Sequence, residues 1–513
     1  PKSDNGKVSI AKTRKLYEED KLNIVISSRN EESQYEKNIE YDTETEKVLG
    51  TIINEEFNHK ADRDDNLLNM GMDSLEVTQL TTKIEEKFNV NVPVSFIFEN
   101  PTINKISKYI DRTLAGEDIA DLEKDKSYLY DEVKLDENIK PGKYEDDAPA
   151  MKNVFITGTT GFVGAYLIHS LLSETEARLY CHVRAKNEEE ALKRIKYNMK
   201  YYNLWKEEYR EFITPVVGSL DEPLLGIEEE KYKMLTETID TVYHNGALLN
   251  FIYPYERLKN TNVGGTIKTL KFACTGKPKY YNYVSSYSVF DNPSHFEKVA
   301  MEDDPIDSCI GYYLSYSETK WVCEKIVNLA RKAGLRAAIY RPGEITGAND
   351  TGIWKLSDSI SRTFKSILQT KVYPNIELKI HMTQVDYIAE AIVKISKQGD
   401  AYGKAYNLMN SVYVSIGELG RIINKCGYEA KPLSYEEWKE NLFSSGNEHP
   451  LKLLESLFRI TKKNEKEEFI NRYGKMSPTH FDTTNTDKAL EGTGLSCEPM
   501  NEALIEKYIK NFI

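Results

Sequence analysis

Apolar residues recur with two different periods along the 513-residue chain. In residues 43–57, and again in 74–88, they repeat every three to four positions, which predicts two amphipathic helices. Pro101 can open a third helix, because proline is favoured at the first helical position. Together these segments predict a small helical bundle over residues 40–113.

The pattern changes after residue 150 to short apolar runs that alternate with helical stretches. Six strands are expected, in the runs NVFITG, RLYCHV, ITPVVG, DTVYHN, YYNYVSS and LRAAIYR. Strands alternating with helices are typical of a parallel, doubly wound α/β sheet of the Rossmann type. We place this core at about 150–350 and a mixed α/β substrate subdomain mostly at 351–513. Between bundle and sheet, residues 114–149 lack sustained periodicity and predict an acidic linker, with a short ordered patch near Tyr128.

Charge and composition narrow the classes of partner. The net charge is −13, and the excess of acidic residues lies within 40–149, so we expect no nucleic acid as partner. No apolar run is long enough to span a bilayer, and no membrane partner is expected. The six cysteines are dispersed and the eight histidines show no ligand spacing, which indicates reduced thiols, a cytoplasmic location and no metal site. The chain opens without a signal-type segment and is expected to be a piece of a longer protein.

A glycine-rich loop follows the first expected strand, in FITGTTGFVG at 155–164. Gly158, Gly161 and Gly164 would allow a tight turn, a close approach to a pyrophosphate and close packing of helix on strand. Thr160 and Phe162 lie in the same turn and are counted with the cofactor contacts. Glycines are also selected by ordinary turns, so the strand–loop–helix setting carries the prediction.

Arg184 stands at the end of the next strand, where an acidic residue would hold a ribose 2′-hydroxyl. An arginine there suits a 2′-phosphate instead, which predicts NADPH rather than NADH. Arg194 on the following helix is a second, weaker candidate. The alternative is a solvated arginine after a strand.

Tyr316 and Lys320 are four residues apart and would share one helix face. The spacing alone is common, since Tyr17, Tyr130, Tyr202, Tyr255 and Tyr435 also have a lysine four residues later. Tyr316 differs because it follows the fifth strand, whose end carries Ser285 and Ser286. We expect Lys320 to lower the phenol's pKa and hold the nicotinamide ribose, Tyr316 to protonate a carbonyl oxygen that receives hydride, and Ser286 to hydrogen-bond that oxygen. A plain amphipathic helix is the alternative.

Ser74, in GMDSL at 71–75, has no histidine within ten residues to act as its base. Asp73 and Glu76 form a D-x-x-E pattern that predicts a capping box and places Ser74 at a helix N-terminus, which favours phosphate. A capping box without further function would look identical.

Residues 150–513 resemble a thioester reductase domain of the extended short-chain dehydrogenase family, as found at the C-terminus of nonribosomal peptide synthetases. The matching stretches occur in the family's order: TGTTGFVG (157–164), VRA (183–185), YHNGA (243–247), NVGGT (262–266), YVSS (283–286), YSETKW (316–321), YRPG (340–343) and VDY (385–387). Residues 40–113 resemble a peptidyl or acyl carrier protein. Residues 1–39 are assigned to the tail of an adenylation domain and a linker, in which Lys7 would be the catalytic lysine.

The resemblance implies that a phosphopantetheinyl transferase attaches 4′-phosphopantetheine to Ser74, and that upstream adenylation and condensation domains load a peptidyl or acyl thioester. NADPH-dependent reduction would then release an aldehyde. Whether reduction continues to an alcohol, and what the cargo is, stay open. This chain departs from the family pattern in having Ser219 in place of an adenine-side aspartate, Ser315 in place of a glycine, Ser286 in place of a threonine, and Asp73 where peptide carriers more often have histidine.

Three other interpretations stay open. A redox-inactive reductase-like domain would release its product by Dieckmann cyclisation, but such domains are expected to lose the tyrosine. A carrier scaffold would only bind nucleotide, and a nucleotide-sugar epimerase or dehydratase would not be expected to carry a fused carrier domain.

Overall fold

The computed structural model describes residues 41–117 and 127–512, apart from 252, 297, 313, 447–448, 455–457 and 459–479. The chain divides into two compact units, Pro1–Lys124 and Asp125–Ile513, and each is described by itself. The predicted adenylation-domain tail at 1–39, with Lys7, lies outside the described residues.

The described part of the first unit is a helical bundle, as predicted. Its helices are α2 (Glu44–Phe57), α3 (Ser74–Phe88), α4 (Val94–Glu99) and α5 (Ile103–Leu114). The core is formed by fully buried side chains at helical spacing: Leu49, Ile53, Leu80, Ile84, Ile106 and Ile110. Helix α5 begins after Thr102, whose side chain accepts a hydrogen bond from the Lys105 amide. Pro101 therefore precedes the cap rather than opening the helix.

The second unit is built on a seven-stranded sheet in the order β12-β7-β5-β4-β1-β2-β3. Every pairing in this sheet is parallel, and Val154 of β1, for example, lies opposite Leu179 on one side and Thr241 on the other. The strands are β1 (Asn153–Thr157), β2 (Arg178–Val183), β3 (Ile213–Val217), β4 (Thr241–His244), β5 (Tyr280–Val284), β7 (Ala337–Pro342) and β12 (Ala405–Leu408). The six predicted strands and the doubly wound class are confirmed. The seventh strand, β12, comes from beyond residue 350, so the sheet extends into the range predicted as substrate subdomain.

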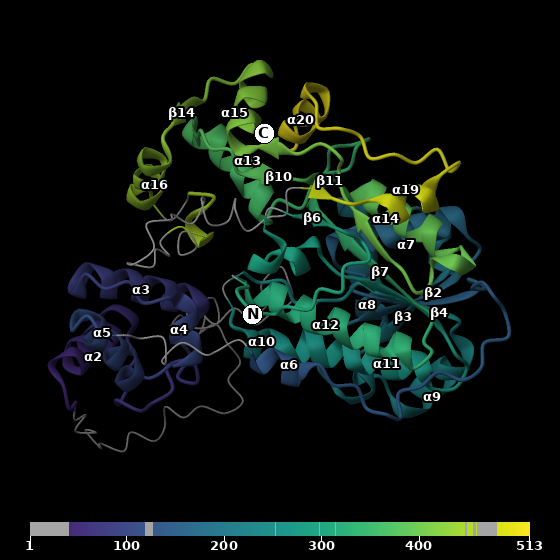
Figure 1. Cartoon of the computed structure of the whole chain (residues 1–513), viewed down its shortest axis with the longest axis horizontal. Helices are drawn as coiled ribbons and strands as arrows, with labels where there is room; N and C mark the ends of the chain where they lie inside the picture. The colour runs from purple at the N-terminus through teal and green to yellow at the C-terminus, as the bar shows by residue number, and fades with distance from the viewer. Residues whose placement is uncertain are drawn as a thin grey trace. The chain divides into compact units, whose positions relative to one another are not determined.

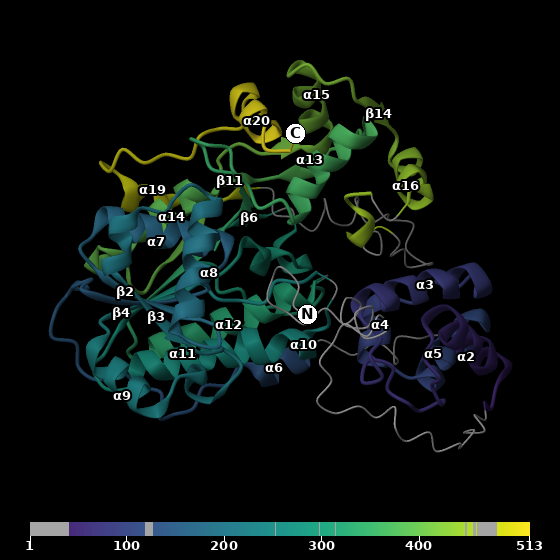
Figure 2. The ribbon, with the colours of Figure 1, turned by 180° about the vertical axis from the view of Figure 1, so that it is seen from behind.

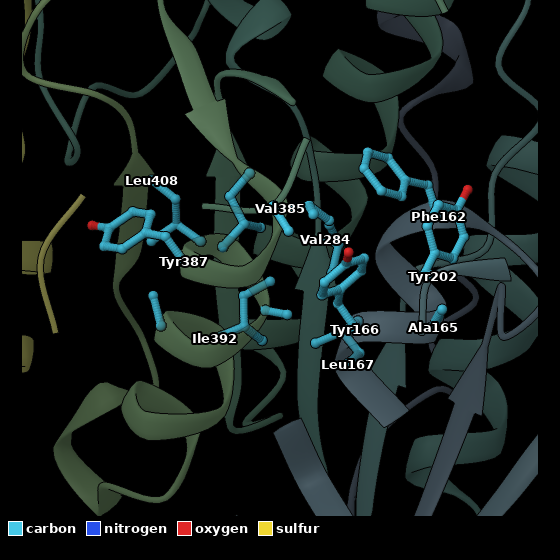
Figure 3. Close-up of a cluster of buried hydrophobic side chains, with 14 of the residues drawn as sticks. Phe162, Ala165, Tyr166, Leu167, Tyr202, Val284, Val385, Tyr387, Ile392 and Leu408 are labelled. Atoms are coloured by element: carbon cyan, nitrogen blue, oxygen red, sulfur yellow. The ribbon is translucent and has the colours of Figure 1, made fainter. Parts of the chain in front are cut away.

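Helices cover both faces of this sheet (Figures 1 and 2). One face is packed by α7 (Phe162–Glu174), α8 (Glu188–Tyr201) and α14 (Val385–Ser396), and the other by α9 (Glu229–Thr238), α11 (Gly265–Cys274) and α12 (Ser315–Lys332). Figure 3 shows part of the hydrophobic cluster between the sheet and α7, α8 and α14. Leu167 of α7 and Ile392 of α14 are both buried in it. Ligands of parallel sheets that are covered on both faces bind at the carboxyl ends of the strands, so a site is expected at that edge.

The remaining elements lie along the chain outside the large sheet. The helices are α6 (Tyr128–Glu132), α10 (Tyr255–Lys259), α13 (Ser359–Thr370), α15 (Ile416–Lys425), α16 (Tyr435–Ser444), α19 (Thr484–Leu490) and α20 (Glu502–Ile509). Short strands pair two by two: β6 (Val299–Ala300) with β15 (His480–Phe481), β8 (Glu344–Thr346) with β11 (Met382–Gln384), β9 (Val372–Pro374) with β14 (Lys431–Leu433), and β10 (Lys379–Ile380) with β13 (Val414–Ser415). None of the helices described here is both long and apolar enough to cross a membrane.

Residues 127–149, which we call the strap, belong to the second unit and pack on the rest of it, although composition predicted an acidic linker there. The Tyr130 ring meets the Trp321 ring of α12 edge-on, with centroids 5.5 Å apart. Further along, the Tyr144 hydroxyl donates to the Lys279 carbonyl oxygen at 3.0 Å. The ordered patch expected near Tyr128 is thus the start of a longer packed segment.

Candidate functional site

The glycine-rich loop joins β1 to α7 at the carboxyl edge of the sheet. Gly158 has a φ of +73°, and a Cβ there would lie 2.8 Å from the Gly246 amide nitrogen. A Cβ on Gly164 would collide with the Gly158 carbonyl oxygen. At both positions the backbone packs too closely against neighbouring backbone for any side chain, so the loop stays tight against α7, whose N-terminus offers amide donors to an anion. This cradle fits a dinucleotide pyrophosphate.

The neighbours of the loop fix its shape. The buried Thr159 hydroxyl donates to the His182 carbonyl oxygen of β2 at 3.1 Å. From α8, the Asn198 side-chain amide donates to the Gly161 carbonyl oxygen at 2.9 Å. Thr160 is half-buried in the turn, whereas the Phe162 ring is buried and its centroid lies 4.9 Å from that of Tyr202. Of the residues predicted to contact the cofactor, Phe162 has only its backbone available, because its side chain is packed in the core.

Two arginines lie at the end of β2, as the sequence predicted. Arg184 is exposed directly after Val183, and the Arg194 guanidinium of α8 donates to the Arg184 carbonyl oxygen. On the neighbouring loop after β3, the Ser219 hydroxyl donates to the Asp221 carboxylate. This hydrogen bond, with a smaller contribution from Arg184, holds the pKa of Asp221 below its usual range. Sequence reasoning singled out Ser219 but missed its carboxylate partner two residues later.

His244, at the end of β4, is a structural residue. Its ring nitrogens hydrogen-bond the Thr157 hydroxyl at 2.9 Å and the Thr266 hydroxyl at 3.1 Å. Complete burial lowers its pKa to about 3, so the imidazole is neutral near pH 7. The histidine of the YHNGA pattern therefore joins the end of β1 to α11 as a neutral, buried ring.

Tyr316 and Lys320 occupy the first two turns of α12, and both side chains are buried. The Lys320 ammonium donates to the Val284 carbonyl oxygen at 2.8 Å, at the last residue of β5. It also lies 5.8 Å from the centroid of the Tyr316 ring. The structure thus brings the predicted tyrosine and lysine to the strand end that Ser285 and Ser286 follow. Ser286 is half-exposed, and its hydroxyl oxygen accepts from the Ser288 amide at 3.2 Å.

Burial changes the electrostatics of this pair. It raises the pKa of the Tyr316 phenol above its ordinary value, and it lowers the pKa of Lys320 to about 8. The predicted lowering of the phenol's pKa is wrong for this arrangement, because desolvation, with a smaller contribution from Cys323, raises it. A phenol that stays protonated at pH 7 is a proton donor rather than a base.

Asn262 is a buried polar residue that sequence reasoning did not single out, apart from its place in NVGGT. It lies in a π-helical turn, Asn260–Gly264, between α10 and α11. Its side chain donates to the Thr319 hydroxyl of α12 at 3.0 Å and accepts from the Leu248 amide at 2.7 Å. The loop after β4 is thereby fastened to the helix that carries Tyr316.

Ser74 is the first residue of α3 in the first unit. The predicted capping box is confirmed, because the Glu76 amide donates to the Asp73 carboxylate and the Asp73 amide donates to the Glu76 carboxylate, each at 3.0 Å. Glu76 also meets the His59 ring nitrogen at 3.3 Å. Gly71, with a φ of +108°, provides the turn that leads into the box.

Across residues 41–117 and the described part of 127–512, no three His, Cys, Asp or Glu side chains gather in a way that could hold a metal ion. Fold and geometry define a class: a small helical bundle with a capped helix that begins at Ser74, followed by a Rossmann-type domain with a buried tyrosine and lysine at the end of β5.

Two family models match this chain. The model described as "Phosphopantetheine attachment site" matches residues 47–110, and the model described as "Male sterility protein", an NAD-binding family, matches residues 156–392. The first contains Ser74 and the second contains Tyr316. The two models therefore fall on the two units and on the two sites.

Relatives and solved structures agree with this division. The chain is 37% identical to a linear gramicidin synthase polypeptide of Brevibacillus parabrevis over 73% of its own length, and 32% identical to the large subunit of L-2-aminoadipate reductase of Candida glabrata over 74%. It spans 8% and 30% of those two relatives. The terminal R domain from the myxalamid biosynthetic pathway is 34% identical, with a TM-score of 0.69, over 75% of this chain and 97% of that one. An archaeal thiolation-reductase di-domain, at 21% identity and a TM-score of 0.69, shares the fold over 92% of this chain and 97% of its own.

The chain belongs to the carrier–reductase family of nonribosomal peptide synthetases, with a phosphopantetheine carrier domain and an NAD(P)-binding thioester reductase domain.

Proposed function

We propose that this chain holds a peptidyl or acyl thioester on 4′-phosphopantetheine at Ser74 and releases it as an aldehyde by NADPH-dependent reduction. The observation that carries the proposal is the meeting of Tyr316, Lys320 and the end of β5 at the strand edge that also carries the glycine loop. A carrier domain on the same chain supplies the class of substrate, a tethered thioester.

Different residues of the chain bind the cofactor and stabilise the reacting oxygen. The loop of Gly158, Gly161 and Gly164 binds the pyrophosphate, and Arg184 with Arg194 binds the 2′-phosphate. Bound NADPH supplies the hydride, so that thioester, NADPH and one proton give aldehyde, thiol and NADP⁺. Tyr316 donates a proton to the former carbonyl oxygen, and Ser286 hydrogen-bonds the same oxygen. Lys320 orients the nicotinamide ribose.

The proposal extends to partners. A phosphopantetheinyl transferase must modify Ser74, and adenylation and condensation domains of the same synthetase would load the arm. Carrier and reductase lie on one chain, and covalent tethering can give effective concentrations on the order of millimolar. Weak docking between carrier and reductase would then suffice.

Mass spectrometry of the released product tests the proposal. The chain is loaded by a broad-specificity transferase with an acyl-coenzyme A, and NADPH is then added or omitted. We expect an aldehyde only with NADPH, in step with NADPH consumption. A cyclised product without NADPH would instead support Dieckmann release, and loaded arms with no product would support a carrier scaffold that only binds nucleotide.

A further inference from the structure

A buried ion pair lies next to the predicted catalytic groups. Glu324 follows Lys320 by four residues on α12, so Tyr316, Lys320 and Glu324 share one helix face. Its carboxylate pairs with the Arg341 guanidinium of β7: Nη2 lies 2.8 Å from Oε2, and Nε lies 3.0 Å from Oε1. The side chains of Glu324 and Arg341 are 0% and 2% exposed. The pair is bidentate and completely enclosed, which is costly unless every polar atom is satisfied.

The remaining acceptor capacity of Glu324 is used by Ser285, which follows β5 and directly precedes Ser286. The Ser285 hydroxyl donates to Glu324 Oε1 at 2.5 Å, and the Ser285 amide donates to the Tyr340 carbonyl oxygen of β7 at 2.7 Å. Ser285 is thus held by both its side chain and its backbone. Because Ser286 is the next residue, the backbone that leads into it is fixed by how Ser285 is held, and its own hydroxyl accepts from the Ser288 amide at 3.2 Å.

Arg341 also supports the turn after Ser286. Its guanidinium lies 4.8 Å from the centroid of the Phe290 ring, at the end of the 3₁₀ turn Tyr287–Phe290. Its Nη1 donates to the Glu302 carbonyl oxygen at 3.0 Å. One buried pair therefore contacts the helix of Tyr316, the residue before Ser286 and the turn after it.

We propose that Glu324 and Arg341 are positioning residues for thioester reduction, and that Ser285 carries their effect to Ser286. The carboxylate of Glu324 fixes the distance between two groups that come from different elements: the Tyr316 phenol on α12 and the Ser286 hydroxyl after β5. This inference rests on the proposed function and adds to it the network that keeps proton donor and oxyanion partner in register. Catalytic groups must be held to within a fraction of an ångström, and a displacement of about 1 Å costs on the order of 10²-fold in rate.

Ser285→Ala is the informative variant, because it removes the hydroxyl and leaves the ion pair closed. We expect kcat for the loaded chain to fall by about 10-fold to 100-fold, while the Kd for NADPH and the unfolding midpoint stay near wild type. Ser285→Thr keeps a hydroxyl and should recover most of the rate. Thr269→Ala is the matched control, since it deletes another buried hydroxyl, bonded to the Tyr281 hydroxyl at 2.8 Å. That change should leave kcat unaltered.

A double variant separates positioning from general structural support. If Ser285 acts through Ser286, then Ser285→Ala has no further effect on kcat in a Ser286→Ala background. Equal losses in both backgrounds would overturn the proposal, as would normal kcat in Ser285→Ala alone. If the Glu324→Gln variant folds, it should show the same loss of kcat. Breaking a buried ion pair can also prevent folding, so the test of the proposal rests on the serine variants. Failure of the proposed function is distinct, since wild type itself would then release no aldehyde.

Discussion

The two sites of this chain are organised on opposite principles. At Ser74 the geometry is set within a few residues, by the glycine turn at Gly71 and the reciprocal bonds of Asp73 and Glu76. Around Tyr316 it is set by α12, β5 and β7, which are joined by a buried lysine and a buried ion pair. The carrier site is local in sequence, whereas the reductase site is assembled from distant segments.

The difference matches the chemistry that each site must do. A carrier serine is a substrate of another enzyme, so it needs presentation rather than an activated environment. A reductase must stabilise charge as it develops on its substrate, which requires preorganised groups that are shielded from water. Variants at each site test whether the carrier site is local and the reductase site is assembled.

Ser74→Ala should abolish the carrier function completely. We expect intact-protein mass spectrometry, after incubation with a broad-specificity transferase and coenzyme A, to show one phosphopantetheine on wild type and none on the variant. NADPH binding by the second unit should be unchanged, because the reductase site does not depend on the arm. A mass shift that persists in Ser74→Ala would place the arm elsewhere.

Tyr316→Phe should lower kcat by about 10²-fold to 10⁴-fold with little change in NADPH affinity. The variant loses a proton donor and an oxyanion partner but keeps its ring, and general acid catalysis is typically of this size. Single-turnover reduction of the loaded chain measures it. Tyr435→Phe is a matched control, because Tyr435 also has a lysine, Lys439, within 5.3 Å of its ring and lies outside the site. Near-normal turnover in Tyr316→Phe would mean that the four-residue spacing of Tyr316 and Lys320 is a coincidence without a catalytic role.

The same contrast explains how far the sequence could predict the molecule. Six strands and the capping box were readable because each is a local pattern. The seventh strand, β12, was missed because AYNL is too short to show a period, and its strand character comes from its partner β7. The strap was missed because its anchoring side chains, such as Leu129 and Tyr144, are interspersed with acidic residues and show no sustained period. Glu324 and Arg341 are 17 residues apart, on a helix and a strand, and only the fold joins them.

Arg184→Ala should weaken NADPH by about 1.5–3 kcal/mol, which is roughly 10-fold to 150-fold in Kd, and should affect NADH less. The reason is the loss of one charge-assisted bond to a 2′-phosphate that NADH lacks. Titration calorimetry with both cofactors gives the ratio of the Kd for NADH to the Kd for NADPH. The alternative view of Arg184 as a solvated residue after a strand requires that ratio to stay constant.

Lys320 should make NADPH binding depend on pH. Its pKa of about 8 in the folded chain lies below the ordinary 10.5, so the ammonium loses its proton as pH rises through about 8. If the charged form holds the ribose, affinity should fall by about tenfold between pH 7 and pH 9, and binding at pH 9 should take up a proton. Calorimetry in two buffers of different ionisation enthalpy detects that uptake. In Lys320→Arg the dependence should vanish, since arginine stays charged throughout.

Asp73→Ala should have the smallest effect, and it tests how local the carrier site is. The variant removes the side chain that accepts from the Glu76 amide, a loss worth about 0.5–2 kcal/mol of stability in the first unit. Thermal unfolding of the chain, followed by probes in the first unit, should show that shift, while NADPH binding stays at the wild-type level. Ser74 should still be modified, more slowly, because the first turn of α3 frays without its cap. Should Asp73→Ala instead change reduction of a thioester supplied in free solution, the attachment site and the reductase site would share more than a tether, and the separation between a local site and an assembled one would have to be given up.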